Sequence, residues 1–288
     1  KFEILKDIIW VIESELLFKC EKISSFLKKN KISITTKSII FTRFLLYTFE
    51  SINYLESREM DSFGLSINLV SKKKVVLLSK YKFLNNSKIS LIQKKIDNKF
   101  LINVTFKFSK RVGYSGENTE EIIKKIFHSK ILSKIDFNEI LSTDLFAHTR
   151  WASVGEVNLS NTHPVLDKKF NEFNLSMMNG DINNYQNIVD ELKKKNKYQL
   201  NDKNCSNDLL PISSLVFNKY SDINSKLNGS YVLVNFNSKD VTKFSLFKKG
   251  TQGLYLAFDE DENIHFATDG YVIVNKSNKI IKFDKDGE

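Results

Sequence analysis

The second half of the chain is a succession of short apolar stretches separated by turn-forming residues, and this pattern strongly constrains the fold. Alternation of apolar and polar residues over four to eight positions is typical of half-buried β-strands. Strands are expected beyond residue 144 at 145–150, 173–178, 230–236, 243–248, 254–258, 264–268, 272–275 and 279–283. Strands this short and this closely spaced favour antiparallel sheets.

Helical periodicity dominates the start of the chain. Residues 2–29 and 37–57 both place apolar side chains at intervals of three and four, as amphipathic helices do. Further helices are expected at about 184–195 and 208–220, and further strands at 65–70, 75–79 and 100–108. Long helices combined with many short antiparallel strands predict an α+β domain in which sheet packs on sheet.

One further helix is indicated by its start signal. Asn118 and Glu121 stand three positions apart before an apolar run, which is the pattern of a capping box. We expect a helix of about ten residues there.

Composition excludes several classes of protein. The chain of 288 residues is 41% hydrophobic and 12% aromatic, which supports a substantial core and excludes global disorder. The net charge of +10 is spread over short lysine runs without interleaved aromatics, so solvated lysines explain it better than nucleic-acid binding.

Cysteine usage and hydropathy point to a compartment. Cys20 and Cys205 lie far apart in sequence and form neither a metal-binding spacing nor a disulfide framework, so a reduced, cytoplasmic protein is expected. No apolar run approaches the roughly 20 residues that a membrane helix needs, so no membrane partner is expected.

Residues 147–164, AHTRWASVGEVNLSNTHP, concentrate rare residue types. Arg150 is one of only four arginines among 44 basic residues. An arginine in a chain that otherwise uses lysine indicates a task that needs two parallel N–H donors, such as gripping a carboxylate.

Four patches stand out, and each also has a plain structural interpretation. The patches are LESREMDSFG (55–64), HTRWASVG (148–155), NTHP (161–164) with MNGDINNY (178–185), and SNDLLP (206–211). Asn179 and Gly180 form a tight turn on the plain interpretation, and Asp208 caps a helix. The remaining residues, His148, His163 and Trp151, would then be core residues.

Together and in this order the patches resemble the glutaminase domain of class II (N-terminal-nucleophile) glutamine amidotransferases, most closely the glucosamine-6-phosphate synthase branch. The likeness runs from a helix ending in LE-x-R-x-x-DS-x-G, through HTRWAS-x-G and HP, to NG at a strand end. It continues through LNGSYVLVNF, GTQGLYLAF and NIHFATDGYVIV, and covers about residues 36–288.

The resemblance implies a fold and a domain organisation. It implies a four-layer αββα sandwich of two antiparallel sheets, the N-terminal-nucleophile hydrolase fold, over residues 31–288. Residues 1–30 are then an added helical insertion packed on this domain. Phosphosugar isomerase domains are expected after Glu288, with a homodimer formed through them, and no metal or organic cofactor is implied.

The resemblance also implies roles in glutamine binding and catalysis. Arg150 would hold the glutamine carboxylate with help from Ser153, and Asp208 would hold the ammonium. The side-chain N–H of Asn179 and the backbone N–H of Gly180 would form the oxyanion hole. Structural support is implied for Arg58, Asp61, Trp151 and His163.

Departures from the family pattern concern neighbouring contacts. Val154, Met178 and Glu59 stand where the synthases have other residues, which puts glutamine affinity and loop closure in question. None of the three positions supplies an essential group in the family.

The nucleophile is the larger departure. The family uses an N-terminal cysteine thiolate, but the corresponding stretch KISITT contains no cysteine, and Cys20 falls in a helix where a buried core position is expected. One interpretation places the cysteine on a strand upstream of Lys1. The implied function is then hydrolysis of glutamine to glutamate and ammonia for amination of fructose 6-phosphate to glucosamine 6-phosphate.

Two alternatives stay open. A catalytically inactive domain that senses glutamine or serves as a scaffold would retain Arg150 and Asp208 without the cysteine. A nucleic-acid binder is supported by net charge alone.

Overall fold

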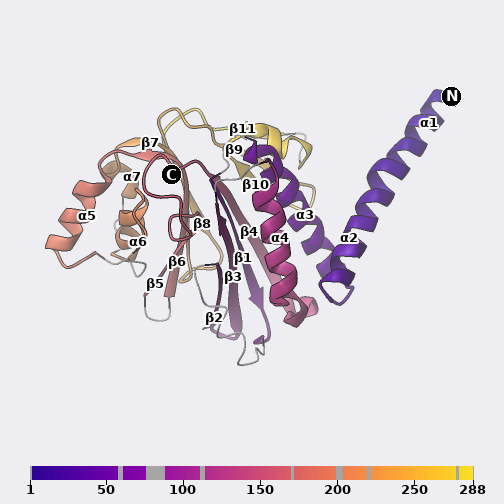
Figure 1. Cartoon of the computed structure of the whole chain (residues 1–288), viewed down its shortest axis with the longest axis horizontal. Coiled ribbons are helices and arrows are strands. Elements are labelled where there is room, and N and C mark those ends of the chain that lie inside the picture. Colours follow the sequence, from indigo (N-terminus) through magenta and orange to yellow (C-terminus); the bar gives the residue numbers. More distant parts are fainter. Residues whose placement is uncertain are drawn as a thin grey trace.

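Helices and antiparallel sheets stack in four layers (Figure 1). The computed structural model describes residues 2–57, 61–75, 88–110, 114–169, 172–198, 204–218, 222–276 and 279–287. One outer layer consists of α3 (Thr36–Glu56) and α4 (Glu117–Ser129). The other consists of α5 (Tyr185–Lys194), α6 (Leu210–Phe217) and α7 (Ile223–Lys226). The expected α+β sandwich of antiparallel sheets is therefore confirmed.

The first sheet has the order β2-β3-β1-β4, and every neighbouring pair is antiparallel. Its strands are β1 (Ser62–Ser71), β2 (Ile89–Ile96), β3 (Lys99–Ser109) and β4 (Ile140–Arg150). All ten residues of β1 are buried, because helices cover one face and the second sheet covers the other. A strand buried on both faces needs apolar side chains or polar side chains that pair with one another. In β1 the apolar residues alternate with polar ones, and Ser66 and Asn68 both accept hydrogen bonds from Asn103 Nδ2 of β3 at 2.7 Å.

The second sheet has the order β5-β6-β7-β8, again with antiparallel neighbours throughout. It contains β5 (Val165–Lys169), β6 (Glu172–Ile182), β7 (Gly229–Asn237) and β8 (Phe244–Lys249). A small third sheet has the order β10-β9-β11, with β9 (Tyr255–Phe258), β10 (Ile264–Ala267) and β11 (Ile280–Lys282). Its strand β10 lies at one edge, as β4 does in the first sheet.

Three buried apolar clusters fill the spaces between the four layers. The periodic face of α3 supplies Phe41, Leu45 and Phe49 to the cluster between the outer helices and the first sheet. Phe146 of β4 and Phe236 of β7 lie 6.1 Å apart, centroid to centroid, in the cluster between the sheets. The third cluster lies between the second sheet and the helices α5 and α6.

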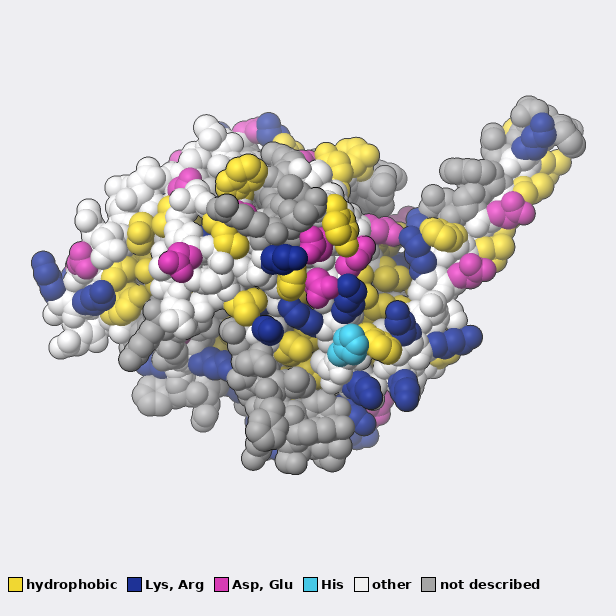
Figure 2. Space-filling view, in the orientation of Figure 1, with side chains coloured by type: hydrophobic (Ala, Val, Ile, Leu, Met, Phe, Trp, Pro, Cys, Tyr) yellow, Lys and Arg dark blue, Asp and Glu magenta, His cyan; other side chains and the backbone are white. Residues whose placement is uncertain are grey.

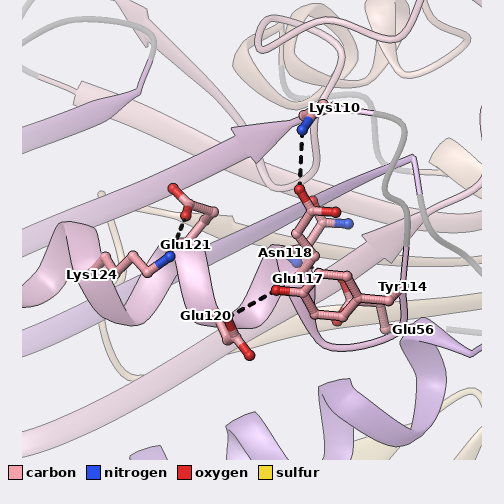
Figure 3. Close-up of polar contacts among 8 residues, drawn as sticks. All are labelled: Glu56, Lys110, Tyr114, Glu117, Asn118, Glu120, Glu121 and Lys124. Atoms are coloured by element: carbon pink, nitrogen blue, oxygen red, sulfur yellow. Dashed lines mark hydrogen bonds and ion pairs between the residues drawn. The ribbon is translucent and has the colours of Figure 1, made fainter.

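A buried carboxylate joins α3 to α4 (Figure 3). Glu56, the last residue of α3, accepts hydrogen bonds from the backbone N–H of Gly116 at 3.0 Å and of Asn118 at 2.9 Å. These are donors of the first turn of α4, which the helix itself cannot satisfy. The expected capping box is wrong, because Asn118 lies inside the helix and Glu121 pairs with Lys124 at 2.8 Å.

The N-terminal helical element packs on the domain only at its end. It consists of α1 (Phe2–Trp10), a π-helix (Val11–Leu17) and α2 (Phe18–Lys29), and it projects from the body in Figure 1. Phe26 and Leu27 are buried in the helix–sheet core. The apolar side chains nearer the start stay exposed along the projecting part (Figure 2), among them Ile4 and Leu5. Cys20 is also exposed, so its expected burial is wrong.

Several other element predictions need correction. Residues 270–276 form a 3-10 helix, η5 (Gly270–Lys276), where a strand at 272–275 was expected. The strands β2 and β5 were not expected, and most of the expected strand 75–79 lies outside the described residues. Within the described ranges no helix has the length and apolar character to cross a bilayer.

Candidate functional site

The site candidates gather where the end of β4 meets the end of β6. Arg150 is the last residue of β4, and its side chain is buried, the residue being 5% exposed. The Arg150 guanidinium donates through Nη2 to the Val154 carbonyl and through Nη1 to the Glu156 carbonyl at 3.3 Å. The loop after β4 therefore folds around the guanidinium, which has five N–H donors and retains others for a ligand.

Two carboxylates, those of Asp208 and Asp61, lie close enough to Arg150 to stabilise its positive charge. Burial lowers the pKa of Arg150, and the charges of Asp208 and Asp61 oppose that shift. Asp61, directly before β1, accepts a hydrogen bond from the Ala152 N–H at 2.9 Å and donates its own N–H to the Arg150 carbonyl at 3.1 Å. Asp61 thus holds both ends of the turn that presents Arg150 and Trp151.

Asp208 lies against the end of β6. Its Oδ2 accepts the Ile182 N–H at 2.7 Å, and the residue is 5% exposed. Burial raises the pKa of Asp208 to about 6, and the Asp181 charge adds to the shift. The helix-cap interpretation is wrong, because α6 begins at Leu210 and has no side-chain cap.

Asn179 and Gly180 belong to β6 and do not form a turn. They pair with Val232 and Tyr231 of β7, so the tight-turn interpretation is wrong. Gly180 has φ +103°, and a Cβ there would lie 2.0 Å from the Ser230 carbonyl oxygen. Only glycine permits this approach of the two strands. The Asn179 side-chain Nδ2 donates to Oε1 of Gln252 at 3.3 Å.

A hydrogen bond between side chains joins the loop to β6. The Ser153 hydroxyl donates to Oδ1 of Asp181, the residue after Gly180. The loop that surrounds the guanidinium is therefore tied to the strand that carries Asn179. Residues 150, 153, 179 and 208 consequently border one region.

His163 is a buried neutral imidazole beneath this region. Burial lowers the pKa of His163 well below its usual value. Its Nδ1 lies 3.1 Å from the Met178 carbonyl oxygen, which fits donation by Nδ1–H, and its Nε2 lies 3.4 Å from Asn207 Nδ2. A cis peptide bond links His163 to Pro164. The support role expected for His163 stays a prediction.

His148 packs beside His163, with ring centroids 4.6 Å apart. Burial lowers the pKa of His148 to about 4, so it is also neutral at pH 7. Among the described residues, no hydrogen-bond partner meets its buried Nδ1. His148 and Asn179 both line a cavity of about 710 Å³ that extends along β4.

The remaining candidates are Trp151, Arg58 and Cys205, together with the departure at Glu59. Trp151 has a side chain that is largely solvent-exposed, at 70% for the residue, so its expected support role stays a prediction. Arg58 and Glu59 lie outside the described residues. Cys205 is buried in the core beside α5 and α6, with its Sγ 3.5 Å from Asn207 Oδ1.

Asp181 and Gln252 are site residues that the sequence did not single out. Asp181 directly follows the Asn179–Gly180 pair, so its position was a usable signal. Gln252 comes from the turn after β8, and nothing in its local sequence connects it with Asn179. In the part of the chain that the structure describes, no cluster of three His, Cys, Asp or Glu side chains is placed to hold a metal ion.

Comparisons with known proteins provide likenesses to solved structures alone. No protein-family model matches the chain, and no curated protein matches it. A solved structure of glutamine phosphoribosylpyrophosphate amidotransferase from B. subtilis, complexed with ADP and GMP, aligns with 79% of this chain at 13% identity and a TM-score of 0.44. The alignment spans 40% of that protein's chain. A likeness this distant carries no argument, and the assignment of function depends on the site geometry and the sequence motifs.

Proposed function

We propose that the chain is a glutaminase domain that hydrolyses the side-chain amide of glutamine to glutamate and ammonia. The observation that carries the proposal is the meeting of three groups at one region. They are the buried guanidinium of Arg150, the buried carboxylate of Asp208 and the Asn179–Gly180 pair on β6. Each group comes from a different element of the fold.

The binding groups match the charges of a free amino acid. Arg150 would hold the α-carboxylate with the N–H donors that the Val154 and Glu156 carbonyls do not use. Asp208 would hold the α-ammonium, because its pKa of about 6 leaves it mostly ionised at pH 7. The amide of the ligand is then free to extend toward Asn179.

The chemical step needs donors for a developing oxyanion. A thiolate adds to the amide carbon, and the carbonyl electron pair moves onto oxygen. The Asn179 side-chain N–H and the Gly180 backbone N–H would stabilise that oxyanion. When it collapses, the C–N bond breaks and the nitrogen takes a proton and leaves as ammonia. Water then hydrolyses the thioester to glutamate and restores the thiol.

The thiolate is not assigned to either cysteine of the chain. Cys205 is buried in the core and Cys20 lies exposed on α2, remote from β6 in the chain. A buried thiol in apolar surroundings is poorly ionised. Following the resemblance, we assign the nucleophile to a cysteine at the free amino terminus of a further strand, where its own α-amino group accepts the thiol proton.

The acceptor of the ammonia is a finer proposal that depends on the sequence motifs. HTRWAS, HP and NG occur in the order found in the glucosamine-6-phosphate synthase branch. We propose that the ammonia aminates fructose 6-phosphate to glucosamine 6-phosphate on phosphosugar isomerase domains of the same polypeptide, which also form a homodimer. Formation of glucosamine 6-phosphate from fructose 6-phosphate and glutamine by the full polypeptide tests this.

A glutamine-sensing or scaffold domain without catalysis is the second candidate. It is favoured by the surroundings of both thiols, since Cys205 is buried in the apolar cluster beside α5 and α6 and Cys20 is exposed on α2. Calorimetric binding of glutamine without any ammonia release by the full polypeptide would support it.

Substitution of Asn179 by alanine tests the proposed chemistry. Removing an oxyanion donor typically costs about 100- to 1000-fold in rate, so we expect Asn179→Ala to lower kcat by that factor while KM for glutamine changes little. The measurement is ammonia release by the full polypeptide. Asn138→Ala, at an exposed position in the short 3-10 helix (Phe137–Glu139) that precedes β4, is the matched control and is expected to retain full activity. A loss confined to KM would remove Asn179 from the chemistry.

A further inference from the structure

The two charged side chains of the proposed site come from different parts of the chain. Arg150 ends β4, and the loop after it folds around the guanidinium. Asp208 lies shortly before α6, and its carboxylate accepts the Ile182 N–H of β6. A ligand that carries both of its charges on one carbon atom needs these two side chains at a fixed distance. The contacts between the two loops therefore decide how well such a ligand is held.

The side chain of Asn161 joins the two loops, and it is fully buried. Its Nδ2 donates to the Glu156 carbonyl at 2.9 Å, the same carbonyl that accepts Nη1 of Arg150. This Nδ2 also donates to Oγ of Ser206 at 3.0 Å, and Asn161 Oδ1 accepts the Ser206 N–H at 2.7 Å. We call these three hydrogen bonds of the Asn161 side chain the Asn161 bridge. Because Ser206 stands two residues before Asp208, the bridge connects the loop of the guanidinium with the loop of the carboxylate.

Gly155 shows how closely the two loops approach each other. It lies between Val154 and Glu156, whose carbonyls accept hydrogen bonds from the guanidinium. Its φ is +81°, and a Cβ there would lie 2.9 Å from the Ser206 carbonyl oxygen and 3.0 Å from Asn161 Nδ2. Glycine permits this approach and a side chain does not. The two loops thus meet backbone to backbone beside the Asn161 amide.

Both ends of the Asn161 bridge are held in place by further contacts. The Asn161 N–H donates to Oδ1 of Asn158 at 2.8 Å, and the Thr162 hydroxyl donates to the Asn158 carbonyl at 2.9 Å. On the other loop, Oδ1 of the fully buried Asn207 accepts the Leu209 N–H at 3.2 Å. Buried polar groups are costly to leave unpaired, so these bonds favour one arrangement of the two loops.

We propose that Asn161 is a positioning residue that sets the distance between Arg150 and Asp208. The proposal rests on the proposed function, because that function assigns the two residues to the carboxylate and the ammonium of one ligand. A fixed distance selects α-amino acids, which carry both charges on the same carbon, over acids that lack the ammonium. Asn161 acts through the two loops and not by contact with the ligand.

A fixed distance makes the two charged contacts cooperative. Once Arg150 holds the carboxylate of an α-amino acid, the ammonium already lies beside Asp208 and loses little further freedom. If the two loops shift relative to each other, the first contact is unchanged, but the second requires the loops to become ordered on binding. Loss of Asn161 is therefore expected to weaken ligands that use both charges and to spare ligands that use one.

Two ligands that the proposed reaction does not consume test this selectivity. Glutamate, its product, carries both charges on the α carbon, and glutarate differs from it only in lacking the ammonium. Calorimetry with the full polypeptide gives the Kd of each at pH 8, where Asp208 is ionised because its pKa is about 6. We expect the unsubstituted protein to bind glutamate roughly 10- to 100-fold more tightly, the range of a hydrogen bond between charged groups.

Two substitutions weaken the Asn161 bridge to different extents. Asn161→Ala removes it, and we expect the Kd of glutamate to rise about tenfold while that of glutarate changes less than about twofold. KM for glutamine should rise by the same factor with kcat unchanged, because Asn179 and Gly180 are not altered. Ser206→Ala keeps the bond from its N–H to Asn161, so it is the milder variant, with an expected rise of about threefold for glutamate. It provides the test if Asn161→Ala does not fold.

Asn218→Ala is the matched control. The Asn218 side chain also donates through Nδ2 to two acceptors, the carbonyls of Lys197 at 2.8 Å and Ser214 at 2.7 Å, at the end of α6. We expect this variant to lower Tm, as Asn161→Ala does, without changing the Kd of either ligand. Unchanged glutamate affinity in the folded bridge variants, or an equal loss for glutamate and glutarate, would overturn the positioning role.

Ammonia release from glutamine by the unsubstituted polypeptide separates this role from the proposed function. A selective loss of glutamate binding in a protein that releases no ammonia would support the positioning role and contradict the glutaminase. Ammonia release combined with an unchanged preference for glutamate in the bridge variants would contradict the positioning role alone. Binding of neither ligand by the unsubstituted protein would contradict both.

Discussion

In the proposed function Arg150 has a ligand role beside the structural role that its contacts show. The substitution Arg150→Lys would remove the proposed two-point grip on the glutamine carboxylate and also the two hydrogen bonds to the Val154 and Glu156 carbonyls. A charge-assisted pair is worth about 2 kcal/mol, so we expect KM for glutamine to rise roughly 30-fold or more. Steady-state kinetics of the full polypeptide with glutamine measures it.

The matched control is Arg43→Lys, at an exposed position on α3. Its glutamine kinetics are expected to stay as in the unsubstituted protein. If a well-folded Arg150→Lys protein also kept its KM, Arg150 would be a loop anchor and not a ligand.

Asp208 makes stability and binding depend on pH in opposite directions. Burial raises its pKa to about 6, above the ordinary value of 3.8, so the folded state binds more protons than the unfolded state between these values. Stability therefore falls as pH rises through this window, by on the order of 2 kcal/mol for Asp208. In the proposed site glutamine binding requires the ionised form, so we expect it to weaken below about pH 6.

Asp208→Asn separates the two effects. At pH 7 we expect this variant to unfold at a higher temperature than the unsubstituted protein and to bind glutamine much more weakly. Near pH 4 the difference in Tm should disappear. Asp144, whose pKa burial also raises to about 6, is present in both proteins and cancels in the comparison. Asp190→Asn, on the exposed side of α5, controls for charge, and an unchanged Tm at pH 7 in Asp208→Asn would contradict the burial argument.

At the scale of elements, Glu56 ties two helices together through the first turn of α4. Its carboxylate is fully buried and accepts from Gly116, Asn118 and Thr119. We expect Glu56→Ala to lower the free energy of unfolding by about 3 kcal/mol, because three donors lose a charged acceptor. Glu121→Ala, which removes only a surface ion pair with Lys124, should cost less than about 1 kcal/mol. Chemical denaturation measures both, and equal losses would mean that the cap contributes nothing specific.

The same contact shows where sequence patterns reach their limit. The buried stripe of α3 was predictable, because Phe41, Leu45 and Phe49 repeat at helical spacing. The cap of α4 was not, because its acceptor comes from another helix some sixty residues away in the chain. The local sequence pattern predicted a capping box at Asn118. In the structure Glu56 of α3 accepts the hydrogen bonds at the start of α4 instead.

Some residues of the candidate site were also predictable from the sequence and others were not. Arg150 and Asp208 were identified from residue type and motif, and the structure places each charge within the other's field. Gln252 reaches Asn179 because the chain after β8 turns toward β6. The two residues are 73 positions apart, so no local sequence pattern connects them. A strand was wrongly predicted at 272–275, because apolar alternation alone does not separate a short strand from a 3-10 helix such as η5, which packs on α3.

At the scale of the whole molecule, the projecting helix contributes little to the folded domain. Of its side chains that the structure describes, only Phe26 and Leu27 near its end are buried, while Leu5, Ile9 and Leu16 are exposed. We expect deletion of residues 1–17 to change Tm by less than about 2 °C, because few buried apolar groups are lost. The deletion should also reduce self-association, since exposed apolar stretches promote it.

Thermal unfolding and light scattering at equal concentrations test this expectation. A matched comparison is Leu27→Ala, which should lower the free energy of unfolding by about 2–5 kcal/mol because it empties a buried site. A deletion as damaging as Leu27→Ala would show that the projecting part belongs to the folded core.

The close antiparallel pairing of β6 and β7 limits which residues of the site can be substituted. At Gly180 and Gly229 a Cβ would lie 2.0 Å from a carbonyl oxygen of the partner strand, so neither position accepts a side chain. Engineers who want the domain to accept other amides therefore have no freedom at these two positions. The adjustable residues are Asp181 and Gln252, which face the same region through side chains alone. If the proposed oxyanion site is correct, we expect its substrate range to be altered at Asp181 and Gln252, while Gly180 and Gly229 stay unchanged.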